Sequence, residues 1–295
     1  MKPTGDDQIH QALVGRVTDT PVPVGASLPT VPIIVGGTDA SAAPDGVTNW
    51  DFFQGALLAV VVKRPDTEPT VIEGTAVMIA PGLALTASHV FRDLVSDIAS
   101  GQAALACIGI RTNGLDIWPV RNVSYTDADD LSYLSLEPQS AFASGWQVSL
   151  LPLTTRAPAV GEELTIVGFR FLEVRERGTD YIAEGDLYAA KGEVTAVYHP
   201  MRDAVRMPFP AIEIACDSLG GMSGGAVLDG KGFLVGIVSS GYPASEGQTG
   251  TTYAAWVIRH LTGNYVFPGL RASIQVPCTF WLYRRPFCTW RAGTR

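Results

Sequence analysis

Short apolar runs of strand length recur from Phe52 onward, and turn residues separate them. The runs at 56–62 and 71–80 are rich in β-branched or small apolar residues. Further runs of this kind cover 103–110, 118–125, 131–136, 163–169 and 192–198. Helical periodicity is confined to the short segments 90–98 and 255–261. Many short strands with frequent turns predict an all-β barrel or sandwich.

The clearest local prediction is a β-hairpin over residues 225–239. Two apolar runs flank the sequence Asp229-Gly230-Lys231-Gly232, and glycine adopts positive φ without steric cost. The chain of 295 residues also holds 31 Gly and 20 Pro, which suits a strand-rich protein better than a helical bundle.

Charge and cysteine usage exclude several classes of function. The formal net charge is −8, whereas phosphate binding needs clustered Lys and Arg, so we predict no nucleic-acid partner. No cysteine has metal-ligand spacing to another Cys or His, and the chain has only four His. We therefore expect no metal site. We expect free thiols at the four cysteines, Cys107, Cys216, Cys278 and Cys288, with a pairing of Cys278 and Cys288 in the tail as the alternative.

The two ends of the chain differ from its middle. Residues 1–44 are rich in Pro, Thr, Gly, Ala and Asp, which predicts a mostly irregular arm. They contain no apolar run of the length of a secretory signal, and no segment reaches 18 consecutive apolar residues. We expect no transmembrane helix and, by default, a cytoplasmic location. Residues 266–295 end in aromatic and Arg residues without a period, which indicates a poorly ordered tail rather than a docking element.

A serine lies in the glycine-dense segment 220–226, which reads Gly-Gly-Met-Ser-Gly-Gly-Ala. Such a turn leaves Ser223 bare and its neighbouring amides free. The amides of Gly221 and Ser223 could form an oxyanion hole, in which one donor is typically worth ~3–4 kcal/mol. A glycine-rich turn without function is the alternative, and a strand rather than a helix follows the serine.

A histidine and an aspartate also occupy suggestive places. His89 follows an apolar strand that ends in small residues, which leave room for the imidazole. Asp130 is the last of three acids in residues 127–130 and directly precedes an alternating apolar run. Taken singly, His89 reads as a structural or exposed histidine, and Asp130 as a turn residue.

Together these segments resemble the chymotrypsin/trypsin-like peptidase family. Residues 85–89 (Leu-Thr-Ala-Ser-His) are similar to its L-T-A-A-H block, and residues 130–134 (Asp-Leu-Ser-Tyr-Leu) to its D-[IL]-A-L-L block. Residues 221–225 (Gly-Met-Ser-Gly-Gly) are similar to its G-[DN]-S-G-G block. The order His, Asp, Ser is the family's order, and the intervals of 41 and 93 residues compare with about 45 and about 93 in its type enzyme.

The resemblance covers about residues 45–265. It implies two antiparallel six-stranded β-barrels, here 45–155 and 156–265, with the active site between them. It also implies a serine endopeptidase without cofactors, acting on polypeptides through an acyl-enzyme, with Ser223 as nucleophile, His89 as general base and Asp130 orienting the histidine. Ser239, Ser240 and Gly241 resemble the family's strand that lines the primary pocket and pairs with substrate. Asp217 and Ser218 lie where trypsin-like members keep the pocket floor.

Departures from the family pattern sharpen the prediction. Met222 stands where the secreted animal members carry an Asp that pairs with a newly freed N-terminal Ile. The sequence Ile34-Val35-Gly36-Gly37 resembles that terminus but lacks its acidic partner, so the chain is closer to the bacterial, non-zymogen branch. For Asp217 a structural role is favoured over selection of basic residues. Two alternative functions are a catalytically silent binding module and an esterase or amidase acting on small substrates.

Overall fold

The computed structural model describes residues 9–13, 53–64, 71–80, 82–111, 114–126, 129–138, 147–154, 156–177, 180–245, 249–257 and 290–291. Most of the predicted N-terminal arm and C-terminal tail, with Ile34, Cys278 and Cys288, therefore lies outside the described residues. Asp127, the first of the three acids in residues 127–130, also lies outside them.

The first barrel is built from six antiparallel strands in the order β6-β5-β2-β3-β4-β7, and the pairing of β6 with β7 closes it. These strands are β2 (Leu57–Lys63), β3 (Val71–Ala80), β4 (Leu83–Ala87), β5 (Ala104–Arg111), β6 (Gly114–Thr126) and β7 (Leu131–Leu136). Strands β4 and β7 are buried along their whole length, because one face fills the barrel and the other is covered by the rest of the molecule.

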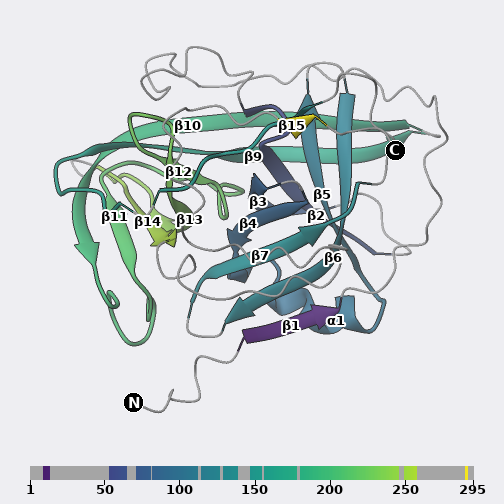
Figure 1. Ribbon diagram of the computed structural model, residues 1–295, viewed down its shortest axis with the longest axis horizontal. Helices are drawn as coiled ribbons and strands as arrows, with labels where there is room; N and C mark the ends of the chain where they lie inside the picture. The colour runs from purple at the N-terminus through teal and green to yellow at the C-terminus, as the bar shows by residue number, and fades with distance from the viewer. Residues whose placement is uncertain are drawn as a thin grey trace.

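The second barrel is closed by six antiparallel strands in the order β10-β11-β14-β13-β12-β9. These strands are β9 (Glu163–Arg177), β10 (Asp180–Tyr198), β11 (Ala211–Ile214), β12 (Ala226–Leu228), β13 (Leu234–Tyr242) and β14 (Thr251–Trp256). The predicted all-β fold with two six-stranded barrels is thus confirmed (Figure 1).

Helix is confined, in the described residues, to short turns. Two 3-10 turns (Ser88–Val90 and Arg92–Leu94) lead into α1 (Val95–Ala99), in the region where a helix is predicted. The helix predicted to begin at Ala255 is wrong at its start. Ala255 and Trp256 end strand β14, where Ala255 pairs with Ala211 on one side and Ile237 on the other. Two backbone ladders outweigh the local helical pattern at that place.

The β9–β10 hairpin is much longer than the apolar runs predict. Its register extends from Glu163 paired with Glu193 to Arg177 paired with Asp180 at the tip. Figure 1 shows this ribbon leaving the second barrel and crossing the top of the first, and β9 contacts β3. The ribbon therefore links the two barrels along their shared edge.

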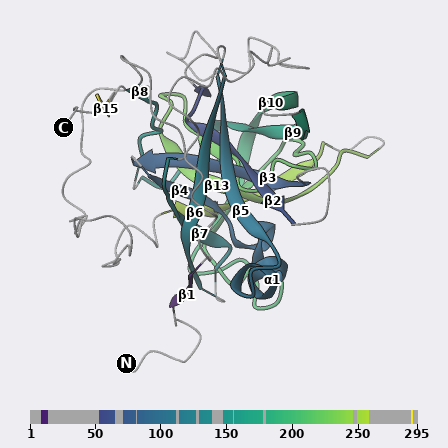
Figure 2. The ribbon, with the colours of Figure 1, turned by 90° about the vertical axis from the view of Figure 1, so that its right-hand side faces the viewer.

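Two short strands fall within the segments predicted to be irregular. Strand β1 (Ile9–Leu13) pairs antiparallel with β6 and contacts α1 (Figure 1), and Figure 2 shows it at the lower edge of the first barrel. Strand β15 (Trp290–Arg291) pairs with β8 (Gln147–Val148). Both ends of the chain thus add a strand to the described fold.

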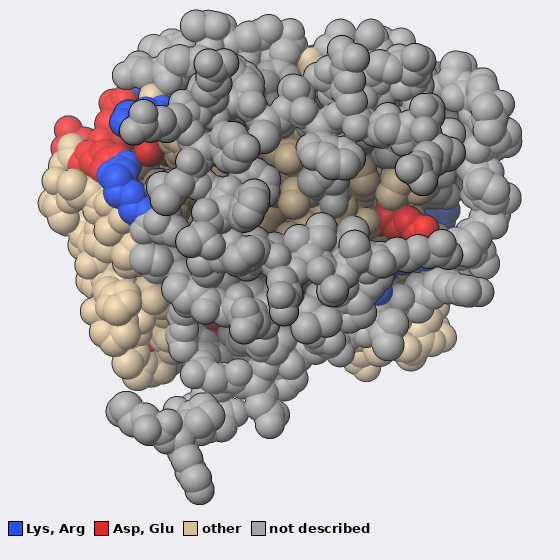
Figure 3. Space-filling model, in the orientation of Figure 1, with Lys and Arg blue, Asp and Glu red and all other residues tan. Residues whose placement is uncertain are grey.

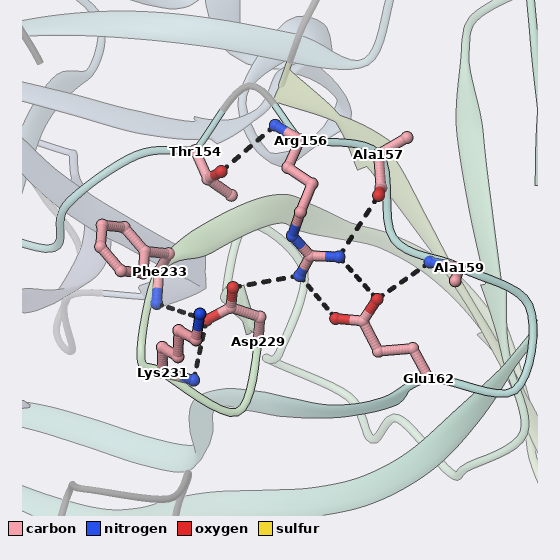
Figure 4. A network of polar contacts seen from close by, with 8 residues as sticks. All are labelled: Thr154, Arg156, Ala157, Ala159, Glu162, Asp229, Lys231 and Phe233. Carbon is pink, nitrogen blue, oxygen red and sulfur yellow. Dashed lines mark hydrogen bonds and ion pairs between the residues drawn. The ribbon is translucent and has the colours of Figure 1, made fainter. Parts of the chain in front are cut away.

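Arg156 lies in the connection between the barrels, and its side chain binds this connection to the second barrel. Its two terminal nitrogens donate to the two carboxylate oxygens of Glu162 at 2.7 and 2.6 Å, and one of them also reaches Asp229 at 3.1 Å (Figure 4). Asp229 in turn accepts the amides of Lys231 and Phe233 at 2.9 Å each. One cation therefore joins the connection to the predicted hairpin turn at 229–232.

No helix in the described ranges is long and apolar enough to cross a membrane. On the face drawn in Figure 3, the described Lys and Arg side chains lie close to Asp and Glu and form no broad basic area.

Candidate active site

His89 and Asp130 are brought together by the pairing of β4 with β7. Ala87 ends β4 opposite Leu131, and the next amide, that of Ser88, donates to the Asp130 carbonyl at 3.1 Å, so His89 emerges beside Asp130. The His89 Nδ1 atom lies 2.8 Å from Asp130 Oδ2, and the His89 backbone N–H donates to Oδ1 at 3.0 Å. The imidazole is 45 % exposed and the carboxylate side chain 11 % exposed. A buried carboxylate thus fixes one edge of a ring whose remainder is open to solvent.

Ser239 is the third group of this cluster, and it comes from the second barrel. Its hydroxyl donates to Asp130 Oδ2 at 2.5 Å. The β13–β14 register shifts between Val238 and Ser240, so Ser239 occupies a bulge, a feature that re-aims a side chain. The resemblance assigns Ser239 to substrate binding, and its hydroxyl contact with Asp130 is not predicted from the sequence.

Ser223 lies on a turn that is fastened to the first barrel. Its carbonyl oxygen accepts the Thr75 amide at 2.7 Å, and the Thr75 hydroxyl donates to the Gly221 carbonyl at 3.0 Å. Gly224 has φ +83°, and a Cβ there would collide with Thr75 O and Thr86 Oγ1. The turn therefore requires glycine at 224. Among the described residues, the Ser223 hydroxyl makes no hydrogen bond with His89.

The amides around Ser223 divide into paired and unpaired groups. The Met222 amide donates to Leu219 O at 3.1 Å, and the Gly224 amide donates to Val238 O at 2.8 Å. Within the described part of the chain, the amides of Gly221 and Ser223 have no hydrogen-bond partner. These two free N–H donors lie on either side of Met222, whose own amide is hydrogen-bonded, and such donors are suited to holding an oxyanion.

Met222 points away from this turn into the second barrel. It is fully buried among the apolar residues of that barrel, and its sulfur accepts the Leu219 amide at 3.3 Å. The place next to Ser223 that holds an Asp in the secreted animal members of the family thus holds an apolar side chain here.

The predicted specificity residues lie beside the same turn. Asp217 is half-buried, and its Oδ1 accepts the Ala244 amide at 2.7 Å. A Cβ at Gly250 would collide with that oxygen, and one at Gly241 would collide with the Ser218 hydroxyl. Asp217 therefore packs against the segments that follow β13 and precede β14, and Ser218 packs against the end of β13. Ser240 and Gly241 are exposed on β13.

The described thiols take no part in this site. Cys107 and Cys216 are free, as predicted for them. Burial raises the pKa of the Cys107 thiol far above its usual range and that of Cys216 to about 11, so neither forms a reactive thiolate at neutral pH. In the ranges that the structure describes, no cluster of His, Cys, Asp and Glu could hold a metal ion.

A double antiparallel barrel with a His–Asp pair and a glycine-rich serine turn at the junction of the barrels defines the class of trypsin-like peptidase folds. The trypsin-like peptidase domain family matches residues 74–237, which is more than half of the chain. The chain belongs to this family.

Solved structures agree with the fold. A crystal structure of Deg5 is 17 % identical with a TM-score of 0.50, covering 71 % of this chain and 88 % of that one. The HtrA-type protease AlgW with decapeptide is 18 % identical with a TM-score of 0.50, covering 72 % of this chain and 64 % of that one. This chain thus spans less than two thirds of the AlgW structure, and at such identities the likeness concerns the fold alone. No curated protein sequence matches the chain at a significant level.

Proposed function

We propose that this peptidase-family chain is a serine endopeptidase that cleaves polypeptides through an acyl-enzyme. The observation that carries the proposal is the His89–Asp130 contact of 2.8 Å beside a serine turn with two free amides. A histidine oriented by a buried carboxylate can take a proton from a nearby hydroxyl, and free amides can stabilise the charge that then develops on a carbonyl oxygen.

The proposed reaction proceeds in two steps. His89 accepts the Ser223 proton as the hydroxyl oxygen attacks the scissile carbonyl, and the amides of Gly221 and Ser223 hold the oxyanion. Asp130 fixes the tautomer of His89 and stabilises the imidazolium, which then protonates the leaving amine. Water, deprotonated by His89, attacks the ester, releases the acid product and restores Ser223. No organic cofactor or metal is required by these steps.

The substrate-binding residues follow from the same arrangement. We propose that the backbone of Ser239, Ser240 and Gly241 pairs with an extended substrate, and that Asp217 and Ser218 support the wall of the primary pocket. Because Asp217 accepts the Ala244 amide, we assign it a structural role, holding the segment after β13 in place.

The experiment is a digest of a peptide library by the purified full-length chain, with the products identified by mass spectrometry. We expect discrete cleavage sites for the wild type, and a loss of at least about 10³-fold in rate for both Ser223→Ala and His89→Ala, because the two residues act as a unit. Cleavage at wild-type rate by either variant would contradict the proposal. Hydrolysis of small esters without any peptide cleavage would favour the esterase alternative, and a folded protein inert toward both would favour the binding module.

A further inference from the structure

Strand β13 has a free edge next to the proposed catalytic residues. Strand β12 pairs with β13 only from Leu234 to Ile237, and Val238 exchanges hydrogen bonds with the serine turn. Beyond Val238, in the described part of the chain, β13 pairs only with β14, and residues 240–242 are exposed. An exposed sheet edge can accept an extended peptide as a further strand. A substrate role for this edge rests on the proposed peptidase function.

The two faces of this edge carry different groups. Because side chains alternate along a strand, Ser240 and Tyr242 share one face, and Tyr253, which is paired with Ser240, lies on that face too. The Tyr242 and Tyr253 rings meet edge to face at 6.2 Å. Gly241 belongs to the opposite face, where it packs against Ser218. The tyrosine face is therefore separate from the primary pocket.

The pleat also assigns substrate positions to these faces. Substrate residues are numbered P1, P2 and so on from the scissile bond toward the substrate N-terminus. The Ser239 hydroxyl bonds to Asp130, so Ser239 is the residue of this edge that lies nearest the proposed catalytic residues, and we place P1 opposite it. An antiparallel substrate then has P4 opposite Tyr242. Residues that lie directly opposite each other share a face of the sheet. The side chain at P4 thus lies on the tyrosine face, whereas that at P3 lies on the other.

Arg206 provides a positive charge at this position. Its guanidinium donates to the Tyr242 hydroxyl at 2.9 Å, and within the described residues it pairs with no carboxylate. Tyr242 is 50 % exposed and Arg206 is exposed, so both remain accessible. A guanidinium has five N–H donors, and most of those of Arg206 are free for a ligand.

The loop that carries Arg206 is held in place by its own contacts. Asp203 Oδ1 accepts the amides of Val205 and Arg206 at 3.0 and 2.6 Å, and Asp203 Oδ2 accepts Arg202 at 2.8 Å. The Arg202 guanidinium lies 4.5 Å over the Tyr253 ring. The loop is thus tied to the same tyrosine that supports Tyr242, which positions Arg206 before a substrate arrives.

We propose that Arg206, oriented by Tyr242, forms a subsite that selects an acidic side chain at P4. A carboxylate at this position can accept two parallel hydrogen bonds from the guanidinium. It also carries the negative charge that strengthens these bonds, which a neutral amide lacks. The preferred substrates are therefore polypeptides with Glu or Asp three residues before the P1 residue.

The test uses two pairs of fluorogenic peptides with the P1 residue that the library digest favours. One pair differs only as Glu or Gln at P4, and the other only as Glu or Gln at P3. We expect wild-type kcat/KM to favour Glu at P4 by about threefold, the size typical of an exposed ion pair, with no preference at P3. Arg206→Gln should reduce the P4 ratio to about one. Lys231→Gln, which removes a charge at the other end of β13, should retain it.

Each other outcome overturns the inference. A wild-type enzyme that cleaves all four peptides with no preference at P4, or with equal preferences at P3 and P4, has no such subsite. A P4 preference that survives in Arg206→Gln belongs to another residue. Failure to cleave any of the peptides would instead overturn the peptidase proposal itself, and this inference with it.

Discussion

Asp130 accepts three hydrogen bonds, and they arrive from both barrels. Its oxygens receive the imidazole and backbone N–H of His89 and the hydroxyl of Ser239. Asp129 is also buried and its backbone carbonyl accepts the Arg92 guanidinium at 3.1 Å, but the hydrogen bonds of the His89 ring and amide go to the Asp130 carboxylate. Of the two adjacent acids, Asp130 is therefore the one placed to act on the imidazole.

Replacing Asp130 by Asn should lower kcat by about 10⁴-fold, the effect of the same change in the type serine peptidase, because the amide favours the wrong imidazole tautomer. Steady-state kinetics on a fluorogenic peptide measure it, and circular dichroism checks that the fold is kept. Asp129→Asn is the matched control and should change kcat by less than tenfold. If Asp129→Asn proves the more damaging change, the orienting acid is misassigned.

At the residue scale, the sequence indicates the candidate catalytic residues but not all of the contacts that position them. His89, Asp130 and Ser223 can be proposed from the sequence because each lies in a short contiguous block. The contact of Ser239 depends on a bulge in β13, and Arg206 reaches Tyr242 across 36 residues of chain. Neither a bulge nor a long-range side-chain contact leaves a local sequence pattern, so these two contacts are seen only in the three-dimensional structure.

At the scale of elements, Arg156 joins the connection between the barrels to the second barrel through Glu162 and Asp229, and its ion pair with Glu162 can be tested. The hydrogen bond from Arg156 outweighs the opposing effect of burial and, helped by the Ala159 amide, holds the pKa of Glu162 below its usual range. A depressed carboxyl pKa adds stability that is present above the ordinary value and lost as the pH falls through the folded one. Since the Arg156 side chain is 47 % exposed, the contribution is small.

Glu162→Gln should therefore lower Tm by about 2 °C at pH 7, which corresponds to about 0.5–1 kcal/mol in a chain of this size. The difference from wild type should shrink below about pH 4, near the ordinary pKa of a Glu side chain, and vanish at lower pH. Thermal unfolding at several pH values measures it. Glu163→Gln, which affects the exposed pair with Lys191, is the control and should change Tm less. A Tm difference that persists at about pH 2 would rule out the ionic contribution.

The elements themselves are mostly legible in the sequence, since runs such as 131–136 coincide with observed strands. The hairpin of β9 and β10 is underestimated because its outer part, from Phe171 to Glu184, mixes charged and apolar residues without a continuous apolar run. Without such a run, the sequence gives no local signal for the continuation of these two strands.

For the whole molecule, the buried Met222 bears on activation. Activation by a new N-terminus needs a carboxylate beside the nucleophile, and here the position holds an apolar side chain within the second barrel. Burying an unpaired ammonium against it would be costly. Ile34 lies outside the described residues, so its part in activation stays a prediction from the sequence.

We therefore expect full-length protein to react with an active-site probe as fast as protein trimmed to begin at Ile34. Pseudo-first-order labelling rates of the two forms provide the comparison. Trimmed protein with its terminal amine acetylated serves as the control and should react at the same rate. A large rate gain on trimming that acetylation abolishes would mean that the terminus is a switch.

The central claim is that Ser223 is an activated nucleophile, and reaction with a fluorophosphonate tests it most directly. We predict that wild-type protein gains the mass of one phosphonyl group, that peptide mapping places it on Ser223, and that Ser223→Ala gains none. Ser100→Ala, which removes an exposed surface hydroxyl, should label like wild type. A folded wild-type protein that stays unlabelled, or a label that persists in Ser223→Ala, would contradict this claim.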